Sequence, residues 1–147
     1  MTHILFNMLA LFIFGVPLER RLGSREFLLY YFVSGIGAGL ATLAVNWYTG
    51  MASIPVVGAS GAVYGVLLAY ATFYPNTRII IFWLLPVRAP VAVLIFAALA
   101  LYSELTGTAS GVAHLTHLAG LVFGFLYLLV RLRINPLRVF FRRTERW

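Results

Sequence analysis

One serine and one histidine, both in apolar segments, have the chemistry of a nucleophile and its base. Ser60 lies in the small-residue run 58–65, where a long apolar segment begins, and His117 lies in a second such segment. A serine hydroxyl becomes a good nucleophile when a base removes its proton, and a neutral imidazole suits that task. The two residues therefore form a candidate dyad for acyl transfer.

Helix packing is the competing explanation for this serine. A serine among glycines often marks a close helix contact, and the four-residue spacing of Gly61 and Gly65 favours such contact. Packing does not account for His117, because ionisable residues at membrane depth are costly and face a bundle interior or a water-filled cavity. Gly120 and Gly124 share the helical face of His117, so they would let the two segments approach closely. One contact between the two apolar segments would then serve both helix packing and catalysis.

Acyl transfer also needs hydrogen-bond donors for the developing oxyanion. His3 and Asn7 are four residues apart, so they face one side of the first apolar segment, and both can donate. The Ser60 backbone N–H, near the start of its helix, is a third donor. Because the sequence has no aspartate to orient a base, Tyr64 could pack against the imidazole instead. Asn7 has an alternative role in an interhelical hydrogen bond.

A metal site is the alternative chemistry for the histidines. His114 lies one turn before His117, and His3 could supply a third ligand for zinc. The sequence has no HExxH motif, and no carboxylate stands near these residues to act as a base. We therefore predict no metal and no organic cofactor, and we expect His114 to be a structural or water-facing residue near the outer interface.

The composition predicts that this chemistry takes place in a membrane. Of the 147 residues, 62% are hydrophobic and only 10% are charged, which is too few to cover a soluble domain. The net charge of +7 rests on arginines that lie between and after apolar segments, which argues against a nucleic-acid partner. There is no cysteine, so disulfides and thiolate metal sites are excluded. We predict an integral membrane protein that contacts the lipid bilayer.

The apolar segments predict an all-α, polytopic transmembrane helix bundle. We expect spans at about residues 4–18, 27–48, 58–74, 89–105 and 112–130, followed by a basic cytoplasmic tail at 131–147. The short apolar run 77–88 suits an interfacial connection better than a span. Arginines follow the first, third and fifth spans, so the positive-inside rule predicts that the chain starts outside and ends inside. His3, Ser60 and His117 then lie at similar depth near the outer face of a bacterial-type inner or plasma membrane.

These motifs together resemble the rhomboid family of intramembrane serine proteases. The resemblance rests on residues 3–7, 19–24, 58–65 and 117–124, whose order and spacing are together highly specific. It implies a membrane domain at 1–130 that cleaves transmembrane-helix proteins near their outer ends. In that domain Ser60 would be the nucleophile and His117 the base, and Tyr64 would stack on the base. The oxyanion hole would use His3, Asn7 and the Ser60 N–H, supported by Gly58 of the GxSG motif.

The family has a six-helix core, and this chain resembles five of those helices. The segment 89–105 resembles the gate helix, and the loop 106–111 resembles the cap over the site. The first core helix and the Trp-Arg loop after it have no counterpart, so we expect a fragment or a start site assigned too late.

Two other classes of function are alternatives to a protease. A non-catalytic rhomboid-like protein would bind membrane helices without cutting them, but it would need to keep neither Ser60 nor His117. A small transporter would have an internal repeat or a pair of interrupted helices. The sequence contains no convincing repeat.

Overall fold

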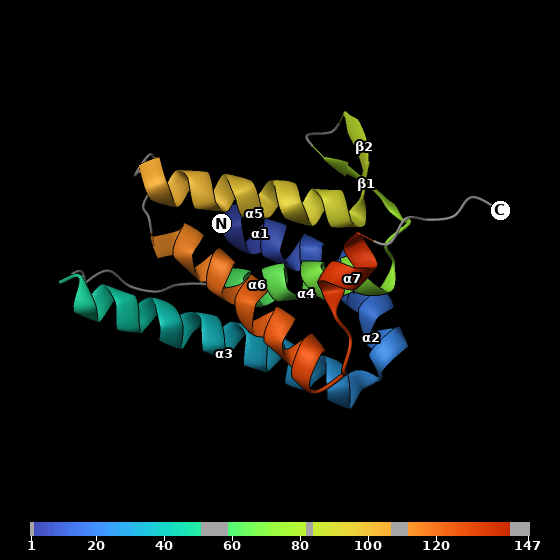
Figure 1. Ribbon diagram of the computed structural model, residues 1–147, viewed down its shortest axis with the longest axis horizontal. Helices are drawn as coiled ribbons and strands as arrows, with labels where there is room; N and C mark the ends of the chain where they lie inside the picture. Colours follow the sequence, from blue (N-terminus) through green and yellow to red (C-terminus); the bar gives the residue numbers. More distant parts are fainter. Residues whose placement is uncertain (1, 51–58, 82–83, 107–111, 142–147) are drawn as a thin grey trace.

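A computed structural model describes residues 2–50, 59–81, 84–106 and 112–141. The elements in chain order are α1 (Thr2–Ala10), the π-helical segment η1 (Leu11–Gly15), α2 (Val16–Leu22), α3 (Ser24–Tyr48), α4 (Ser60–Phe73), β1 (Arg78–Ile81), β2 (Leu85–Arg88), α5 (Ala89–Thr106), α6 (Val112–Val130) and α7 (Pro136–Phe140). The long helices run in alternating directions through one bundle (Figure 1). The fold is therefore a mostly helical, up-and-down arrangement.

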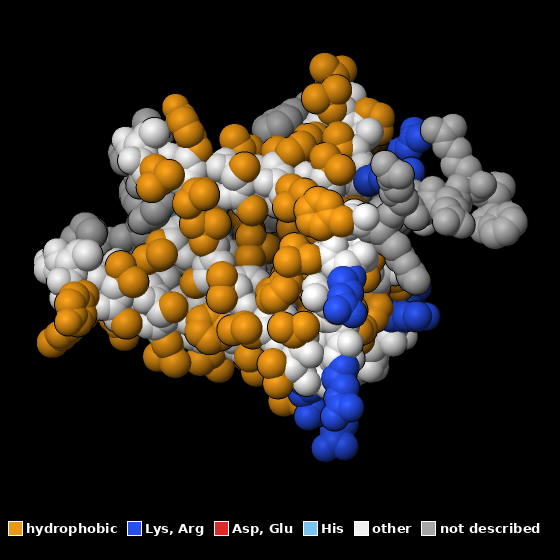
Figure 2. All heavy atoms as spheres, in the orientation of Figure 1, with side chains coloured by type: hydrophobic (Ala, Val, Ile, Leu, Met, Phe, Trp, Pro, Cys, Tyr) orange, Lys and Arg blue, Asp and Glu red, His pale blue; other side chains and the backbone are white. Residues whose placement is uncertain are grey.

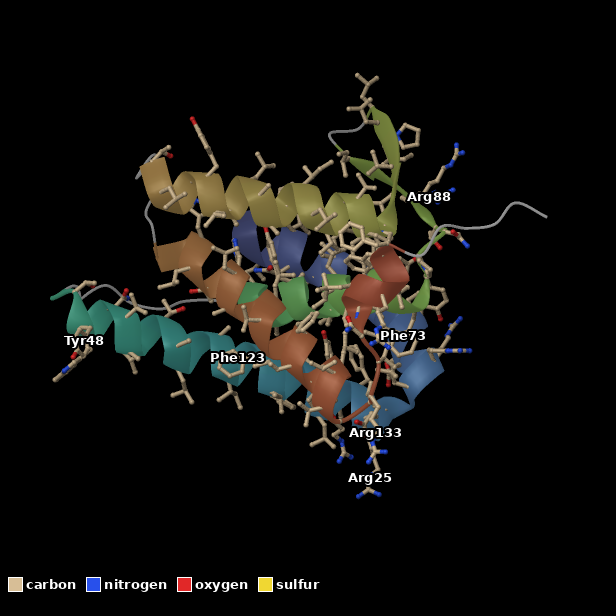
Figure 3. All side chains as sticks on the ribbon, viewed as in Figure 1. Arg25, Tyr48, Phe73, Arg88, Phe123 and Arg133 are labelled. Carbon is tan, nitrogen blue, oxygen red and sulfur yellow. The ribbon has the colours of Figure 1, made fainter. Side chains whose placement is uncertain are left out.

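The helices cover all five apolar segments of the sequence, but they differ in length. Within the described residues, α3 is the one helix that is long and apolar enough by itself to cross a bilayer. Shorter apolar helices occupy Ser60–Phe73, Ala89–Ser103 and His114–Val130. Arg25 and Tyr48 mark the two ends of α3 in Figure 3, and the arginine side chains visible in Figure 2 gather at the Arg25 end. One end of the bundle is thus cationic.

The central helix is α4, which packs against α3, α5 and α6. Most of its side chains are buried, from Gly61 to Thr72. Its 14 residues reach only about 21 Å at 1.5 Å per residue, less than the roughly 30 Å of a hydrocarbon core. In Figure 1, α4 begins well short of the end that α3 reaches. The helix therefore starts inside the bundle, and Ser60 is its first residue.

The run 77–88 forms a β-hairpin, so the prediction of an all-α chain is wrong at this point. Strands β1 and β2 pair antiparallel, with Ile79 opposite Val87 and Ile81 opposite Leu85. Three consecutive β-branched isoleucines favour an extended strand over a helix. Pro86 is tolerated because a two-stranded sheet consists of edge strands. Ile79 packs against the hydrophobic core of the bundle, and both strands contact α5.

The first helical segment extends further than the expected span at 4–18. It continues through η1 and α2 to Leu22, and the chain turns at Gly23, whose φ of 83° favours glycine. The wider π turn lies just before Pro17, which has no N–H to donate to the regular helical ladder. The Gly23 N–H donates to the Glu19 carbonyl at 2.7 Å, which closes α2.

The tail contains a short helix that the sequence analysis did not predict. Asn135 caps α7 because its side-chain oxygen accepts hydrogen bonds from the N–H groups of Leu137 and Arg138, at 3.0 and 3.4 Å. Pro136 is buried, and α7 packs back against α4 and α6. The expectation of a basic tail falls partly on residues 142–147, outside the described residues.

Candidate active site

The contact between α4 and α6 is made by glycines on both helices. A Cβ on Gly120 would collide with the carbonyl oxygen of Gly61, and one on Gly124 would lie 3.1 Å from the Gly65 Cα. A Cβ on Gly61 would lie 3.1 Å from the Thr116 carbonyl oxygen. The two backbones therefore touch with no side chain between them, next to Ser60 on one helix and His117 on the other.

Tyr64 and His117 stack across this contact. Their ring centroids are 4.2 Å apart, and the ring planes differ by 5°. Tyr64 lies one turn after Ser60 on α4, so the stack brings the serine-bearing turn beside the turn that carries the imidazole. The Nδ1 atom of His117 is shielded from solvent. Tyr64 thus lies against the imidazole, and its expected role in orienting that ring stays a prediction.

The start of α4 offers a hydrogen-bond donor at the same place. The first N–H groups of a helix have no acceptor within it, and α4 begins at Ser60 with no side-chain cap from Ala59. The backbone N–H of Ser60 thus belongs to the groups that can bind an oxyanion. The expected roles of Ser60 and His117 as nucleophile and base stay predictions.

Asn7 and Tyr64 line one cavity between α1, α4 and α5. Its volume is about 340 Å³, and its lining is mainly apolar. The remaining lining residues are Phe6, Ala10, Phe14, Val63, Leu67 and Phe96. The structure thus brings one expected oxyanion donor to the same cavity as the residue that stacks on the imidazole. The side chain of His3 and the whole of Gly58 fall outside the described residues.

His114 contacts the other histidine on α6 edge to face. The ring centroids of His114 and His117 are 6.0 Å apart, with planes at 80°. Within the described part of the chain, no group of three or more His, Asp or Glu side chains is arranged to hold a metal ion.

Buried polar residues along α3 are a part of the site region that the sequence analysis missed. The Tyr30 hydroxyl donates to the Gly65 carbonyl at 2.6 Å, and the hydroxyls of Thr42 and Thr116 lie 3.0 Å apart. Thr116 directly precedes His117, so this pair supports the helix that carries the imidazole. The sequence does mark this buried face of α3, through a four-residue repeat formed by Tyr30, Ser34, Ala38, Thr42 and Asn46.

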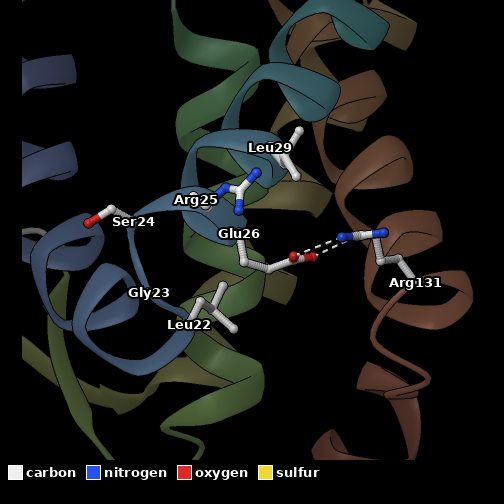
Figure 4. A pocket seen from close by; sticks show the side chains of 7 residues that line it. All are labelled: Leu22, Gly23, Ser24, Arg25, Glu26, Leu29 and Arg131. Carbon is white, nitrogen blue, oxygen red and sulfur yellow. Dashed lines mark hydrogen bonds and ion pairs between the residues drawn. The ribbon is translucent and has the colours of Figure 1, made fainter.

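An ion pair joins α3 and α6 at the arginine-rich end. Arg131 donates from Nε and Nη2 to the two carboxylate oxygens of Glu26, at 2.8 and 3.1 Å (Figure 4). Tyr127 donates to the same carboxylate at 2.6 Å, and hydrogen bonding to Glu26 raises the pKa of Arg131 above its ordinary value. A cavity of about 640 Å³ adjoins the pair. This network ties the helix ends together far from Ser60.

The apolar bundle, with its polar centre between α4 and α6, defines a membrane protein with a site enclosed by helices. Residues 1–134 match the Rhomboid domain, and the chain therefore belongs to the rhomboid family. This membership confirms the resemblance found in the sequence. It makes the chain an integral membrane protein, and its relatives include proteins named as rhomboid proteases.

Three relatives illustrate the similarity. Rhomboid protein 1, mitochondrial, of Saccharomyces cerevisiae is 34% identical, over 85% of this chain and 36% of that protein. Rhomboid protease AarA of Providencia stuartii is 31% identical, over 92% of this chain and 55% of that protein. Rhomboid protease GlpG of Haemophilus influenzae is 34% identical, over 92% of this chain and 66% of that protein.

The chain is shorter than these relatives. It spans 36% of the yeast protein and 55% of the Providencia protein. No solved structure gives a significant match to it.

Proposed function

We propose that this chain is an intramembrane serine endopeptidase that cleaves transmembrane helices through a dyad of Ser60 and His117. The observation that carries the proposal is the stack of Tyr64 on His117, one turn from Ser60, at a contact where glycines let α4 and α6 touch. A purely structural contact would need the glycines but neither the hydroxyl nor the imidazole. Family membership supports the same reaction class.

The reaction begins when His117 accepts the proton of the Ser60 hydroxyl and the serine oxygen attacks the scissile carbonyl carbon. Asn7, His3 and the Ser60 N–H donate hydrogen bonds to the oxyanion that forms. His117 then gives its proton to the leaving amine. A water molecule hydrolyses the acyl-enzyme, with the same imidazole acting as the base.

The cavity between α1, α4 and α5 is the proposed binding site for the substrate. Its apolar lining suits a segment of transmembrane helix, and Asn7 gives it a polar group for the reacting carbonyl. The resemblance to rhomboids implies cleavage near the outer end of the substrate helix, where small or helix-breaking residues let the backbone extend. We expect α5, which forms one wall of the cavity, to move when the substrate binds.

Cleavage of a fluorescent transmembrane peptide in proteoliposomes tests the proposal. The chain is expressed with any in-frame sequence upstream of Met1. Ser60→Ala should abolish cleavage, whereas Ser24→Ala, at the opposite end of the bundle, should leave it intact. Asn7→Ala should lower kcat about 10²–10³-fold, as for other oxyanion donors. Retained cleavage by Ser60→Ala would refute the dyad, and peptide binding without cleavage by the unaltered protein would indicate a non-catalytic binder.

A further inference from the structure

The β1–β2 hairpin presents apolar side chains outside the helix bundle. Ile80, Leu84 and Leu85 are 67%, 78% and 53% exposed. The hairpin projects sideways from the bundle beside the first turns of α5, and hydrophobic side chains cover the part of it that lies furthest from the helices (Figures 1 and 2). These side chains would be costly to leave in water.

The strand register divides the hairpin into two chemically different faces. Arg78 pairs with Arg88, and Ile80 pairs with Pro86. Because side chains alternate along a strand, these four residues lie on one face of the hairpin. The opposite face carries Ile79, which packs against the hydrophobic core of the bundle, and Ile81, which is 4% exposed. The outward face is therefore cationic at the base of the hairpin and apolar toward its tip.

The place of the hairpin in the fold favours a lipid surface as its partner. Arg88 directly precedes α5, and its side chain points away from the helices (Figure 3). The hairpin thus lies where an apolar membrane helix begins, at the end of the bundle where the arginines gather. Arginines near a membrane surface attract anionic lipids, and amphipathic elements at the interface bury their apolar side below the headgroups. From base to tip, the hairpin is first cationic and then apolar. A lipid leaflet has the matching order from its surface inward, with phosphates first and acyl chains below them.

We infer that the β1–β2 hairpin anchors the protein in the leaflet at the arginine-rich end. Ile80 and Leu84 enter the acyl region, while the exposed Arg78 binds the phosphates of anionic phospholipids. The anchor fixes the start of α5 relative to the membrane. It does not depend on Ser60 or on proteolysis, so it can be tested in the inactive Ser60→Ala protein.

Site-directed spin labelling tests this inference directly, because the chain has no cysteine of its own. Ile80→Cys and Leu84→Cys are each labelled with a nitroxide, in vesicles of phosphatidylcholine and phosphatidylglycerol at low protein density. Asn76→Cys, an exposed position before the hairpin, is the matched control. We expect the two hairpin labels to collide with oxygen and not with a water-soluble nickel chelate, at about 5–10 Å below the phosphates. The control label should collide with nickel.

The contribution of Arg78 is measured in the Ile80→Cys protein by adding Arg78→Gln. In the anionic vesicles the collision rate of the label with the nickel chelate should then rise. In pure phosphatidylcholine this rise should be smaller. If both hairpin labels collide with the nickel chelate in the protein that keeps its arginines, the membrane anchor is refuted. Shielding of both labels from oxygen and nickel would also overturn it, because a second copy of the chain would then cover the hairpin. An unchanged collision rate of the label after loss of Arg78 would refute the role of anionic lipids.

Discussion

Gly120 is the position where the contact between α4 and α6 leaves no room for a side chain. In a Gly120→Ala variant the added Cβ would fall onto the carbonyl group of Gly61. This obstacle is backbone, which cannot rotate away as a side chain can, so α6 has to move. Overpacking typically costs about 1–3 kcal/mol, and the rigid obstacle puts this variant near the upper end. A loss of about 3 kcal/mol is a change of roughly a hundredfold in the folding equilibrium.

Unfolding of the purified protein in mixed detergent micelles measures this loss. The matched control is Gly39→Ala on α3, since a Cβ there would meet no atom within 4 Å. The control adds the same methyl group and should keep or slightly raise stability, because alanine is the better helix former by about 0.5–1 kcal/mol. Movement of α6 would also carry His117 away from Ser60, so the reactivity of the serine should fall in Gly120→Ala alone. Equal stability of the two variants would refute the close contact.

Three further variants test other contacts in the bundle. Tyr30→Phe removes the hydrogen bond to the Gly65 carbonyl and should lower the free energy of unfolding by about 1 kcal/mol; an unchanged value would contradict this role. Arg131→Gln breaks an ion pair whose arginine side chain is 57% exposed, so the stability loss should be small and should vanish at high salt. A loss that salt does not alter would be inconsistent with that explanation. Asn135→Ala removes the cap of α7, and trypsin should then cut at Arg138 faster than in the unaltered chain; an equal cleavage rate would show that packing alone holds α7.

Features that depend on long apolar segments could be predicted from the sequence. The helices lie on the five apolar segments because a bilayer requires internally satisfied backbone groups. The stack of Tyr64 on His117 was expected because Ser60 and Tyr64 share a face of one helix, and the glycines of the other helix allow close approach. The family followed from the order and spacing of the motifs.

Features that depend on short segments or on rotation of a helix could not be predicted in the same way. An apolar run as short as 77–88 is compatible with a strand or a helix. It forms strands here because its two halves pair with each other. The four-residue repeat of Tyr30, Thr42 and their neighbours indicates the buried face of α3, but it does not reveal which groups on other helices they bind. The five residues of α7 are too few for a helical pattern, and packing of Pro136 stabilises them.

The central claim is that His117 activates Ser60 as a nucleophile, and labelling with a fluorophosphonate tests it most directly. The probe reacts with activated serines, and mass spectrometry of the labelled peptide identifies the modified residue. We expect a single adduct on Ser60 that is lost in His117→Ala and kept in His114→Ala. An unlabelled Ser60 in the folded protein, or equal labelling after removal of His117, would contradict it.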